Sequence, residues 1–278
     1  MFAGNRRATQ RAAGYPEMPF LELDCASIHY RFDGSEQDPV LVLSNSLGTN
    51  LSMWDGQTRA LAERFRVMRY DTRGHGQSSV TPGPYSIPQL GRDVVRLLDA
   101  FEIERAHFCG LSMGGMTGMW LGAHAAARIG RLALCNTAAK IGTAEVWNGR
   151  IEAVRQGGMA AIAEAVIRRW FTSTFIARAP EAVEHTRQMI LSTPPGGYTA
   201  NCAAIRDMDQ RETISRIIAP TLVIAGANDN VTTPSDAHYI VERVPGARYA
   251  ELGAAHLSNI EAPGQFTQTL LQFLEGRS

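Results

Sequence analysis

A serine between two glycines is the residue of this chain best suited to covalent chemistry. Ser112 lies in Gly110-Leu-Ser-Met-Gly114, after the apolar run 105–110, which predicts a short buried strand, and before the run 113–127, which predicts a helix. At so abrupt a turn the serine backbone is strained and its hydroxyl is pushed outward, and glycines are needed where strand and helix pack closely. We predict that Ser112 is a nucleophile for acyl transfer. The competing interpretation is a glycine-rich turn with an incidental serine, because this short motif also occurs by chance.

A serine hydroxyl is a weak nucleophile at neutral pH, so it needs a base within hydrogen-bond reach and a third group that orients the base. Asp229 comes just after an apolar run that ends at Gly226, and His256 follows the last apolar run of the chain. The order serine, acid, histidine is the one found with a serine at a strand-to-helix turn of this kind. We therefore predict Ser112, Asp229 and His256 as the catalytic residues.

A second aspartate competes for the role of the acid. Asp236 lies three residues beyond Thr233, in the first turn of a helix that begins at a proline. This position suits Asp236 to satisfying the free backbone N–H groups of the helix start, so we prefer Asp229. Asp236 is kept as the alternative.

The other basic side chains are expected to have structural roles. His75, in Arg73-Gly-His-Gly76, precedes Ser112 in the chain and is predicted to tie a loop beside the site. Lys140 is the only lysine, which disfavours Schiff-base chemistry. The remaining histidines lack the spacing of metal ligands, so no metal site is predicted: His29, His107, His124, His185 and His238.

The tetrahedral intermediate of acyl transfer requires hydrogen-bond donors directed at its oxyanion, each worth ~3 to 4 kcal/mol. One is expected to be the backbone N–H of Met113, directly after the nucleophile at a helix start. The second is expected in the loop after the third strand, which places it at Leu47. Because both donors are backbone groups, their side chains are equally consistent with simple packing.

Strand-like and helix-like segments alternate along most of the chain, which predicts an α/β fold. Two alternating segments within 20–32 suggest an antiparallel pair at the sheet edge. Continuous apolar runs, such as 39–44, 129–136 and 220–226, are typical of parallel strands covered on both faces. Residues 86–89 have the form of a capping box and begin a run with helical spacing. We predict a mostly parallel, eight-stranded sheet flanked by helices.

The alternation breaks at Lys140, and every periodic segment from there to about Gln210 predicts helix. We interpret residues 140–210 as a helical cap inserted after the sixth strand, over the carboxyl ends of the sheet, where open α/β folds bind ligands. The core then comprises residues 18–139 and 211–278. Residues 1–17 carry three arginines and a proline without periodicity, and are predicted to be a disordered extension.

Composition excludes several classes of partner. A formal net charge of zero does not favour nucleic acid or an anionic membrane surface. The chain contains no run of 18 or more apolar residues and no apolar signal core, so membrane insertion and secretion are not expected. The cysteines lack C-x-x-C pairing and two of them lie in apolar runs, which favours free thiols and a cytoplasmic location: Cys25, Cys109, Cys135 and Cys202. Oligomeric state is not predicted.

Taken together, the motifs resemble the α/β-hydrolase superfamily over essentially the whole chain after residue 18. They are the serine pentapeptide, Asp71-Thr-Arg-Gly-His-Gly-Gln-Ser78, Asp229 and His256. More narrowly, Leu43-Ser-Asn-Ser-Leu-Gly-Thr49 with Met53-Trp54 is similar to the 3-oxoadipate enol-lactonases of aromatic-acid degradation. Most superfamily members have His-Gly where this chain has Asn45-Ser46, and this departure agrees with the enol-lactonases.

The resemblance implies hydrolysis of 3-oxoadipate enol-lactone to 3-oxoadipate without a metal or an organic cofactor. The substrate is a small lactone with a free carboxylate, so a buried cation or a cluster of N–H groups should meet that carboxylate. Arg150, three residues after Trp147 on one helical face, is the candidate, and a solvated helix arginine is the alternative. Trp147 either walls the pocket or anchors the cap to the core. Ser46, in the loop that resembles the enol-lactonases, is a third candidate for substrate binding.

The same residues are compatible with other functions. A carboxylesterase, a C–C bond hydrolase or a cofactor-free perhydrolase would keep the same three catalytic residues and change the acyl group. Haloalkane dehalogenases and epoxide hydrolases are disfavoured, because they use an aspartate nucleophile in place of Ser112. The alternative from another class is a ligand-sensing receptor on this scaffold, since fold does not dictate function.

Overall fold

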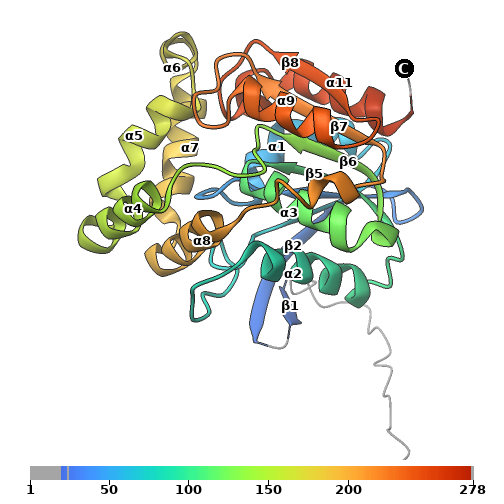
Figure 1. The fold of residues 1–278 in the computed structure, drawn as a ribbon, viewed down its shortest axis with the longest axis horizontal. Helices are drawn as coiled ribbons and strands as arrows, with labels where there is room; N and C mark the ends of the chain where they lie inside the picture. Colours follow the sequence, from blue (N-terminus) through green and yellow to red (C-terminus); the bar gives the residue numbers. More distant parts are fainter. Residues whose placement is uncertain (1–19, 24, 277–278) are drawn as a thin grey trace, which may run out of the picture.

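The computed structural model describes residues 20–23 and 25–276; the extension predicted at residues 1–17 and the predicted start of the core at residue 18 lie outside them. The strands of this part of the chain are β1 (Phe20–Leu23), β2 (Ala26–Asp33), β3 (Val40–Ser44), β4 (Arg66–Tyr70), β5 (Ala106–Leu111), β6 (Ile129–Cys135), β7 (Thr221–Gly226) and β8 (Arg248–Leu252). They form one sheet in the order β1-β2-β4-β3-β5-β6-β7-β8 (Figure 1). β2 is antiparallel to β1 and β4, and the other pairs are parallel, which confirms the predicted eight-stranded, mostly parallel sheet.

Helices alternate with these strands and continue beyond the last one. The α-helices are α1 (Asp55–Leu61), α2 (Ile87–Ala100), α3 (Met113–His124), α4 (Ala144–Gly157), α5 (Ala160–Trp170), α6 (Ser173–Arg178), α7 (Pro180–Ser192), α8 (Pro195–Asp207), α9 (Pro234–Arg243), α10 (Ser258–Glu261) and α11 (Pro263–Leu274). Short 3₁₀ turns are η1 (Leu51–Trp54), η2 (Ala126–Arg128) and η3 (Ile214–Arg216). None of the helices in the described ranges is long and apolar enough to cross a membrane.

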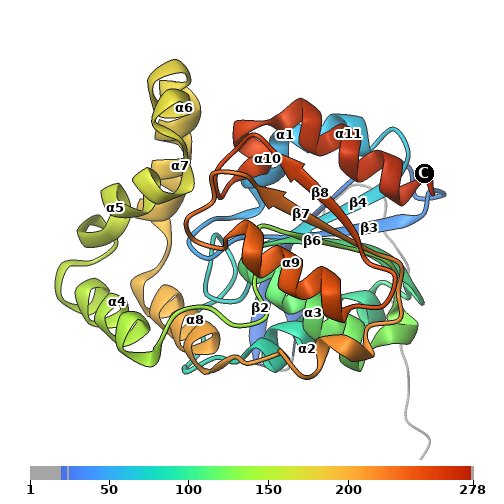
Figure 2. The same ribbon diagram turned by 45° about the horizontal axis from the view of Figure 1, so that its top comes forward.

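The sheet is covered on both faces, which is why its central strands are continuous apolar runs. Figure 2 shows α1 and α11 on one face and α2, α3 and α9 on the other. Helix α2 turns Leu90, Val94 and Leu97 inward, and all three are buried. Every residue of β7 is buried as well. The carboxyl ends of β3, β5, β6, β7 and β8 therefore lie along one edge of a rigid layer.

Helices α4 to α8, which we call the cap helices, all lie between β6 and β7 in the sequence and gather at one end of the sheet (Figures 1 and 2). The two ends of the insertion meet, because Gln210 N–H donates to the Ala139 carbonyl over 2.9 Å. The far side of the insertion reaches the loop after β3. A Cβ built on Gly48 would lie 3.2 Å from the Tyr198 ring and 3.8 Å from the Trp170 ring.

Two local predictions differ from the structure in their details. At the start of α2, the Ser86 hydroxyl accepts from Gln89 N–H over 3.3 Å, which is the serine half of the predicted capping box. The box with both halves occurs at α9 instead, where Thr233 and Asp236 cap each other. Both helices still begin where the sequence indicates, because one side-chain acceptor is enough to satisfy a free N–H of the first turn.

Candidate active site

Ser112 lies at the turn between β5 and α3 in a backbone conformation that few residues other than glycine adopt, with φ 56° and ψ −113°. Such a conformation costs ~1 to 3 kcal/mol and persists only where the surroundings enforce it. Here Ser112 N–H donates to the Cys135 carbonyl over 2.9 Å, and the Ser112 carbonyl accepts from Thr137 Oγ1 over 2.8 Å. These bonds hold the serine at the carboxyl edge of the sheet.

The two glycines of the pentapeptide are required by the close packing around this turn. A Cβ on Gly110 would lie 2.1 Å from the Gly114 carbonyl oxygen. A Cβ on Gly114 would lie 2.2 Å from the Ser44 carbonyl oxygen. Both distances are far below van der Waals contact, so the predicted collision is confirmed.

Asp229 and His256 lie together although they are 27 positions apart in the sequence. Both side chains are buried, and His256 Nδ1 donates to Asp229 Oδ2 over 2.8 Å. Because Nδ1 carries the proton of this bond, Nε2 of the neutral ring is left as an acceptor. The rival aspartate is used elsewhere, since Asp236 Oδ2 accepts from Thr233 N–H over 2.7 Å.

Asp229 is surrounded by donors, which explains how a buried carboxylate keeps its charge. Its Oδ1 accepts from the N–H groups of Val231 and Thr232, at 2.7 and 3.0 Å. Its Oδ2 accepts from Thr232 Oγ1 at 2.8 Å and from Asn136 Nδ2 at 3.0 Å, besides His256. Burial raises the pKa of Asp229, but His256 and these hydrogen bonds outweigh burial and lower the pKa to about 2. Asp229 is therefore ionised at neutral pH.

Two backbone N–H groups have no acceptor among the described residues: that of Met113, directly after Ser112, and that of Leu47, in the loop after β3. The amides beside them are occupied, because Gly48 N–H donates to a histidine nitrogen and Gly114 N–H to a backbone carbonyl. Both residues are buried, and an unpaired buried N–H is costly. These two donors are thus free to bind a negatively charged oxygen.

The loop that carries Leu47 is held by three side chains. Asn45 Nδ2 donates to the Tyr70 carbonyl over 2.8 Å, and Asn45 Oδ1 accepts from Trp54 Nε1 over 2.9 Å. Ser46 N–H donates to the thioether sulfur of Met53 over 3.3 Å. The amide N–H groups around Leu47 are therefore turned toward protein acceptors.

His75 also supports this loop. Its Nε2 accepts from Gly48 N–H over 2.8 Å, so the proton of the neutral ring is on Nδ1. Complete burial lowers the pKa of His75 to about 4, and the ring is therefore neutral at pH 7. The structure agrees with the prediction that His75 ties a loop beside the site.

Comparison with known proteins identifies the scaffold. The family model described as the alpha/beta hydrolase fold matches residues 39–263. The chain belongs to the α/β-hydrolase family.

Relatives of this hydrolase include enzymes that act on enol-lactones. A 3-oxoadipate enol-lactonase of Acinetobacter baylyi is 44% identical over 88% of this chain and 91% of the relative. The crystal structure of an enol-lactonase from Burkholderia xenovorans superposes with a TM-score of 0.91 at 48% identity, covering 92% of this chain and all of that one. A putative carbamate hydrolase of Azorhizobium caulinodans is 31% identical over 92% of this chain and 98% of the relative. The resemblance to enol-lactonases is confirmed, and the hydrolase is of the esterase or lactonase type.

The three candidates for substrate binding lie in different surroundings. Ser46 is buried, and its hydroxyl has no hydrogen-bond partner within the described ranges. Trp147 is buried, and its Nε1 donates to the Ile141 carbonyl over 3.0 Å, which anchors α4 to the segment entering the cap helices. Arg150 is half-buried, and its guanidinium lies 5.5 Å from the centre of the Trp147 ring.

Arg150 has no carboxylate partner among the described residues, which is unusual for a partly buried cation. Arg150 is close enough to α8 to interact electrostatically with two of its residues. Burial raises the pKa values of Tyr198 and Cys202, and the positive charge of Arg150 lowers them in part. Tyr198 in turn lies over Gly48. Arg150 is therefore a partly buried positive charge close enough to act on Tyr198, and Tyr198 contacts the loop that carries Leu47.

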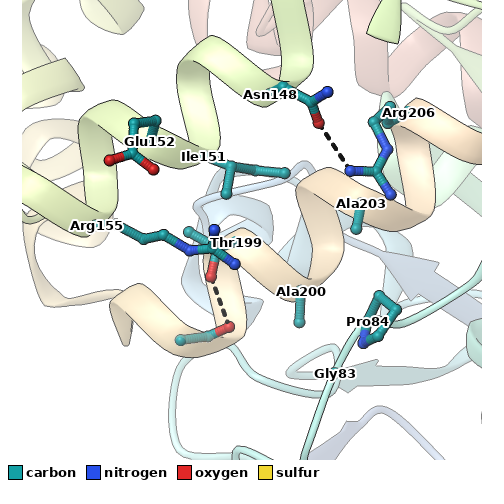
Figure 3. Close-up of a pocket in the computed structure, with 11 residues that line it drawn as sticks. Gly83, Pro84, Asn148, Ile151, Glu152, Arg155, Thr199, Ala200, Ala203 and Arg206 are labelled. Carbon is teal, nitrogen blue, oxygen red and sulfur yellow. Dashed lines mark hydrogen bonds between the residues drawn. The ribbon is translucent and has the colours of Figure 1, made fainter.

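A large groove of the described surface is separate from these residues. It measures about 610 Å³ and lies between α4, α8 and the loop at Gly83 and Pro84. Figure 3 shows Arg155 and Arg206 at this groove, with Arg206 hydrogen-bonded to Asn148. Neither Ser112 nor its partners line the groove, so we do not assign the reaction to it.

Sequence reasoning missed the side chains that support the candidate catalytic residues. Asn136, Thr232 and Met53 carry no local pattern that marks them, although Met53 is part of the segment that resembles the enol-lactonases. Glu261, five residues after His256, was also missed. No group of three or more His, Cys, Asp or Glu side chains within the described ranges could hold a metal ion.

Proposed function

We propose that this hydrolase converts 3-oxoadipate enol-lactone to 3-oxoadipate in the degradation of aromatic acids through protocatechuate or catechol. The observation that carries the proposal is the buried Asp229–His256 pair at the same sheet edge as Ser112 and two unpaired N–H groups, in a chain similar to enol-lactonases. In this proposal residues 140–210 form a cap over that edge.

The proposed reaction has two stages. In the first, Ser112 Oγ attacks the lactone carbonyl carbon while His256 Nε2 takes the hydroxyl proton and Asp229 stabilises the imidazolium. The N–H groups of Leu47 and Met113 donate to the oxyanion of the tetrahedral intermediate. Collapse of the intermediate breaks the ring C–O bond and expels an enolate oxygen, to which the His256 imidazolium gives its proton. His256 is then neutral again, and the resulting enol tautomerises to the ketone.

In the second stage, water attacks the acyl carbonyl while His256 takes a proton from it. The bond to Ser112 then breaks, and His256 returns the proton to the serine oxygen, so the enzyme is restored and a carboxylic acid leaves. Every step uses side chains and backbone N–H groups of this chain, and the proposal requires no cofactor.

Arg150 and Ser46 would recognise the substrate. The free carboxylate of the lactone would pair with Arg150, which has no carboxylate partner among the described residues. The unpartnered hydroxyl of Ser46 would donate to a polar atom of the bound lactone. A cytoplasmic location stays a prediction, and the free thiols of Cys109, Cys135 and Cys202 are consistent with a reducing compartment.

A kinetic panel tests the proposal: enol-lactone, simple p-nitrophenyl esters and a vinylogous diketone, each with the wild type and with Ser112→Ala. We expect a large preference in kcat/KM for the lactone, and a loss in kcat of at least about a thousandfold in Ser112→Ala. Equal kcat/KM for lactone and simple esters would favour a general carboxylesterase. Near-normal activity of Ser112→Ala would rule out the serine mechanism.

The substrate carboxylate gives a second test. We expect Arg150→Ala to raise KM for the lactone about tenfold or more, since a charged hydrogen bond contributes ~1.5 to 3 kcal/mol, and to leave KM for a neutral p-nitrophenyl ester unchanged. Arg155→Ala is the matched control, because Arg155 lies on the same helix but is exposed at the outer groove. Equal effects of Arg150→Ala on both substrates would remove Arg150 from the carboxylate site.

A further inference from the structure

A buried carboxylate outside the proposed catalytic set lies between His256 and the cap helices. Glu261, at the end of α10, is only 4% exposed. Its Oε2 accepts from Ala255 N–H over 3.0 Å and from Thr172 N–H over 3.3 Å, and its Oε1 accepts from the Thr172 hydroxyl. One carboxylate thus joins the residue before His256 to the junction between α5 and α6.

The peptide group on the other side of His256 is held by the same junction. Leu257 N–H donates to the Trp170 carbonyl over 3.2 Å. The Trp170 ring also lies beside the imidazole of His256, with 6.2 Å between ring centres. The N–H groups that flank His256 are therefore both fixed by residues 170–172, one directly and one through Glu261.

Thr172 is suited to this connection because its hydroxyl has two bonds. It donates to Glu261 Oε1 and accepts from Phe175 N–H over 3.2 Å as the N-cap of α6. The other end of α6 has a further tie to Glu261, since Arg178 Nη2 donates to the Glu261 carbonyl over 3.2 Å. A movement of the junction would thus be transmitted to the loop of His256.

We propose that Glu261 and Thr172 are positioning residues, which couple the cap helices to His256 and hold its imidazole in the geometry needed for proton transfer. The inference rests on the proposed role of His256 as the base. Misplacing a catalytic group by 1 Å can cost ~100-fold in rate, so loss of the connection should slow the chemical step more than it weakens substrate binding.

The test uses a reaction of Ser112 that does not depend on lactone recognition. An alkyl fluorophosphonate forms a P–O bond to the serine oxygen and releases fluoride, while His256 takes the serine proton. We expect Thr172→Val and Glu261→Gln to lower the second-order rate constant about tenfold or more. With the lactone, kcat should fall similarly and KM should stay within about twofold.

Conservative and control variants separate positioning from general stability. Thr172→Ser keeps the hydroxyl and should react within about twofold of the wild type. Thr174→Val, at an exposed threonine of α6, should have no effect. The proposal would be overturned if Thr172→Val were phosphonylated at the wild-type rate. It would also be overturned if Thr172→Val and Thr172→Ser lost the same fraction of that rate. If Glu261→Gln fails to fold, the comparison of the two Thr172 variants decides alone.

The failure of the proposed function has a different signature. A wild type that is rapidly phosphonylated but does not hydrolyse the lactone would contradict the substrate assignment and leave the comparison of Thr172 variants valid. Phosphonylation of Ser112→Ala at the wild-type rate would contradict the nucleophile, and the positioning proposal would fall with it.

Discussion

At the scale of single residues, the thioether of Met53 stabilises the loop that carries Leu47. The Met53 sulfur accepts from Ser46 N–H at 3.3 Å and from the Thr49 hydroxyl at 3.0 Å. Both donors belong to the loop that carries Leu47. A thioether is a weak acceptor, but a buried donor left without any partner costs ~1 to 3 kcal/mol. The sulfur therefore helps to hold the loop in the conformation in which Leu47 N–H has no acceptor among the described residues.

Met53→Leu tests this support. The two side chains have similar volumes, so stability should change by less than about 1.5 kcal/mol. The Ser46 amide loses its acceptor, and we expect kcat for the lactone to fall about tenfold with KM unchanged, because Leu47 N–H, the proposed oxyanion donor, becomes less well placed. Met119→Leu, at a buried methionine of α3, is the control. If Met53→Leu and Met119→Leu have equal kcat values, the Met53 sulfur does not support the loop of Leu47.

At the scale of elements, the two aspartates near β7 illustrate how position decides function. Asp229 follows the strand directly and contacts His256, whereas Asp236 lies in the first turn of α9 and completes a capping box with Thr233. The capping box satisfies N–H groups that the helix itself leaves unpaired. Each aspartate therefore has a full set of partners, and neither is placed to replace the other.

Exchange of each carboxylate for an amide separates these roles. We expect Asp229→Asn to lower kcat by orders of magnitude, ~10⁴-fold in the comparable change in a serine protease, because the imidazole loses its orienting charge. Asp236→Asn should leave kcat near the wild type and lower the free energy of unfolding by at most ~1 kcal/mol. Steady-state kinetics and urea unfolding measure the two effects. The reverse pattern would make Asp236 the acid.

At the scale of the whole molecule, the site depends on connections between the sheet and the cap helices. Ala139 and Gln210 join the two ends of the insertion, and Tyr198 and Trp170 of the cap helices lie over the loop after β3. Glu261 of α10 accepts from Thr172 N–H at the junction between α5 and α6. Because the cap helices are tied to the core at several points, we expect them not to move independently of the candidate site. Stability and catalysis should therefore respond together to changes in the buried supports.

The pH dependence of stability provides a test at this scale. The pKa of His75 is lowered from 6.5 to about 4 by burial, so between these values the unfolded chain binds a proton that the folded chain does not. Stability should therefore fall as pH decreases through this window, with about 2 kcal/mol lost from this group between pH 7 and pH 5. His75→Gln, which keeps an acceptor for Gly48 N–H, should lose less over the same range. Urea unfolding at both pH values measures the loss. If the wild type and His75→Gln lose the same free energy of unfolding between pH 7 and pH 5, His75 is not the source of the pH dependence.

The sequence by itself determined the elements of the core and the order of the candidate catalytic residues. The pentapeptide around Ser112, the apolar runs and the helix starts are local patterns, and local patterns follow from sterics and side-chain periodicity. The resemblance to the enol-lactonases also came from a local stretch, the loop at Asn45 and Ser46. These features required no knowledge of which distant segments meet.

Only the tertiary structure decided what supports the site. The bond from Thr172 to Glu261 joins residues 89 positions apart, and the bond from Asn136 to Asp229 joins residues 93 positions apart. The unpaired state of Leu47 N–H likewise depends on acceptors that other segments supply to its neighbours. Such partners are set by packing between elements, and no pattern in the flanking residues specifies them. Periodicity places a side chain on a face, whereas only the assembled fold determines what lies opposite it.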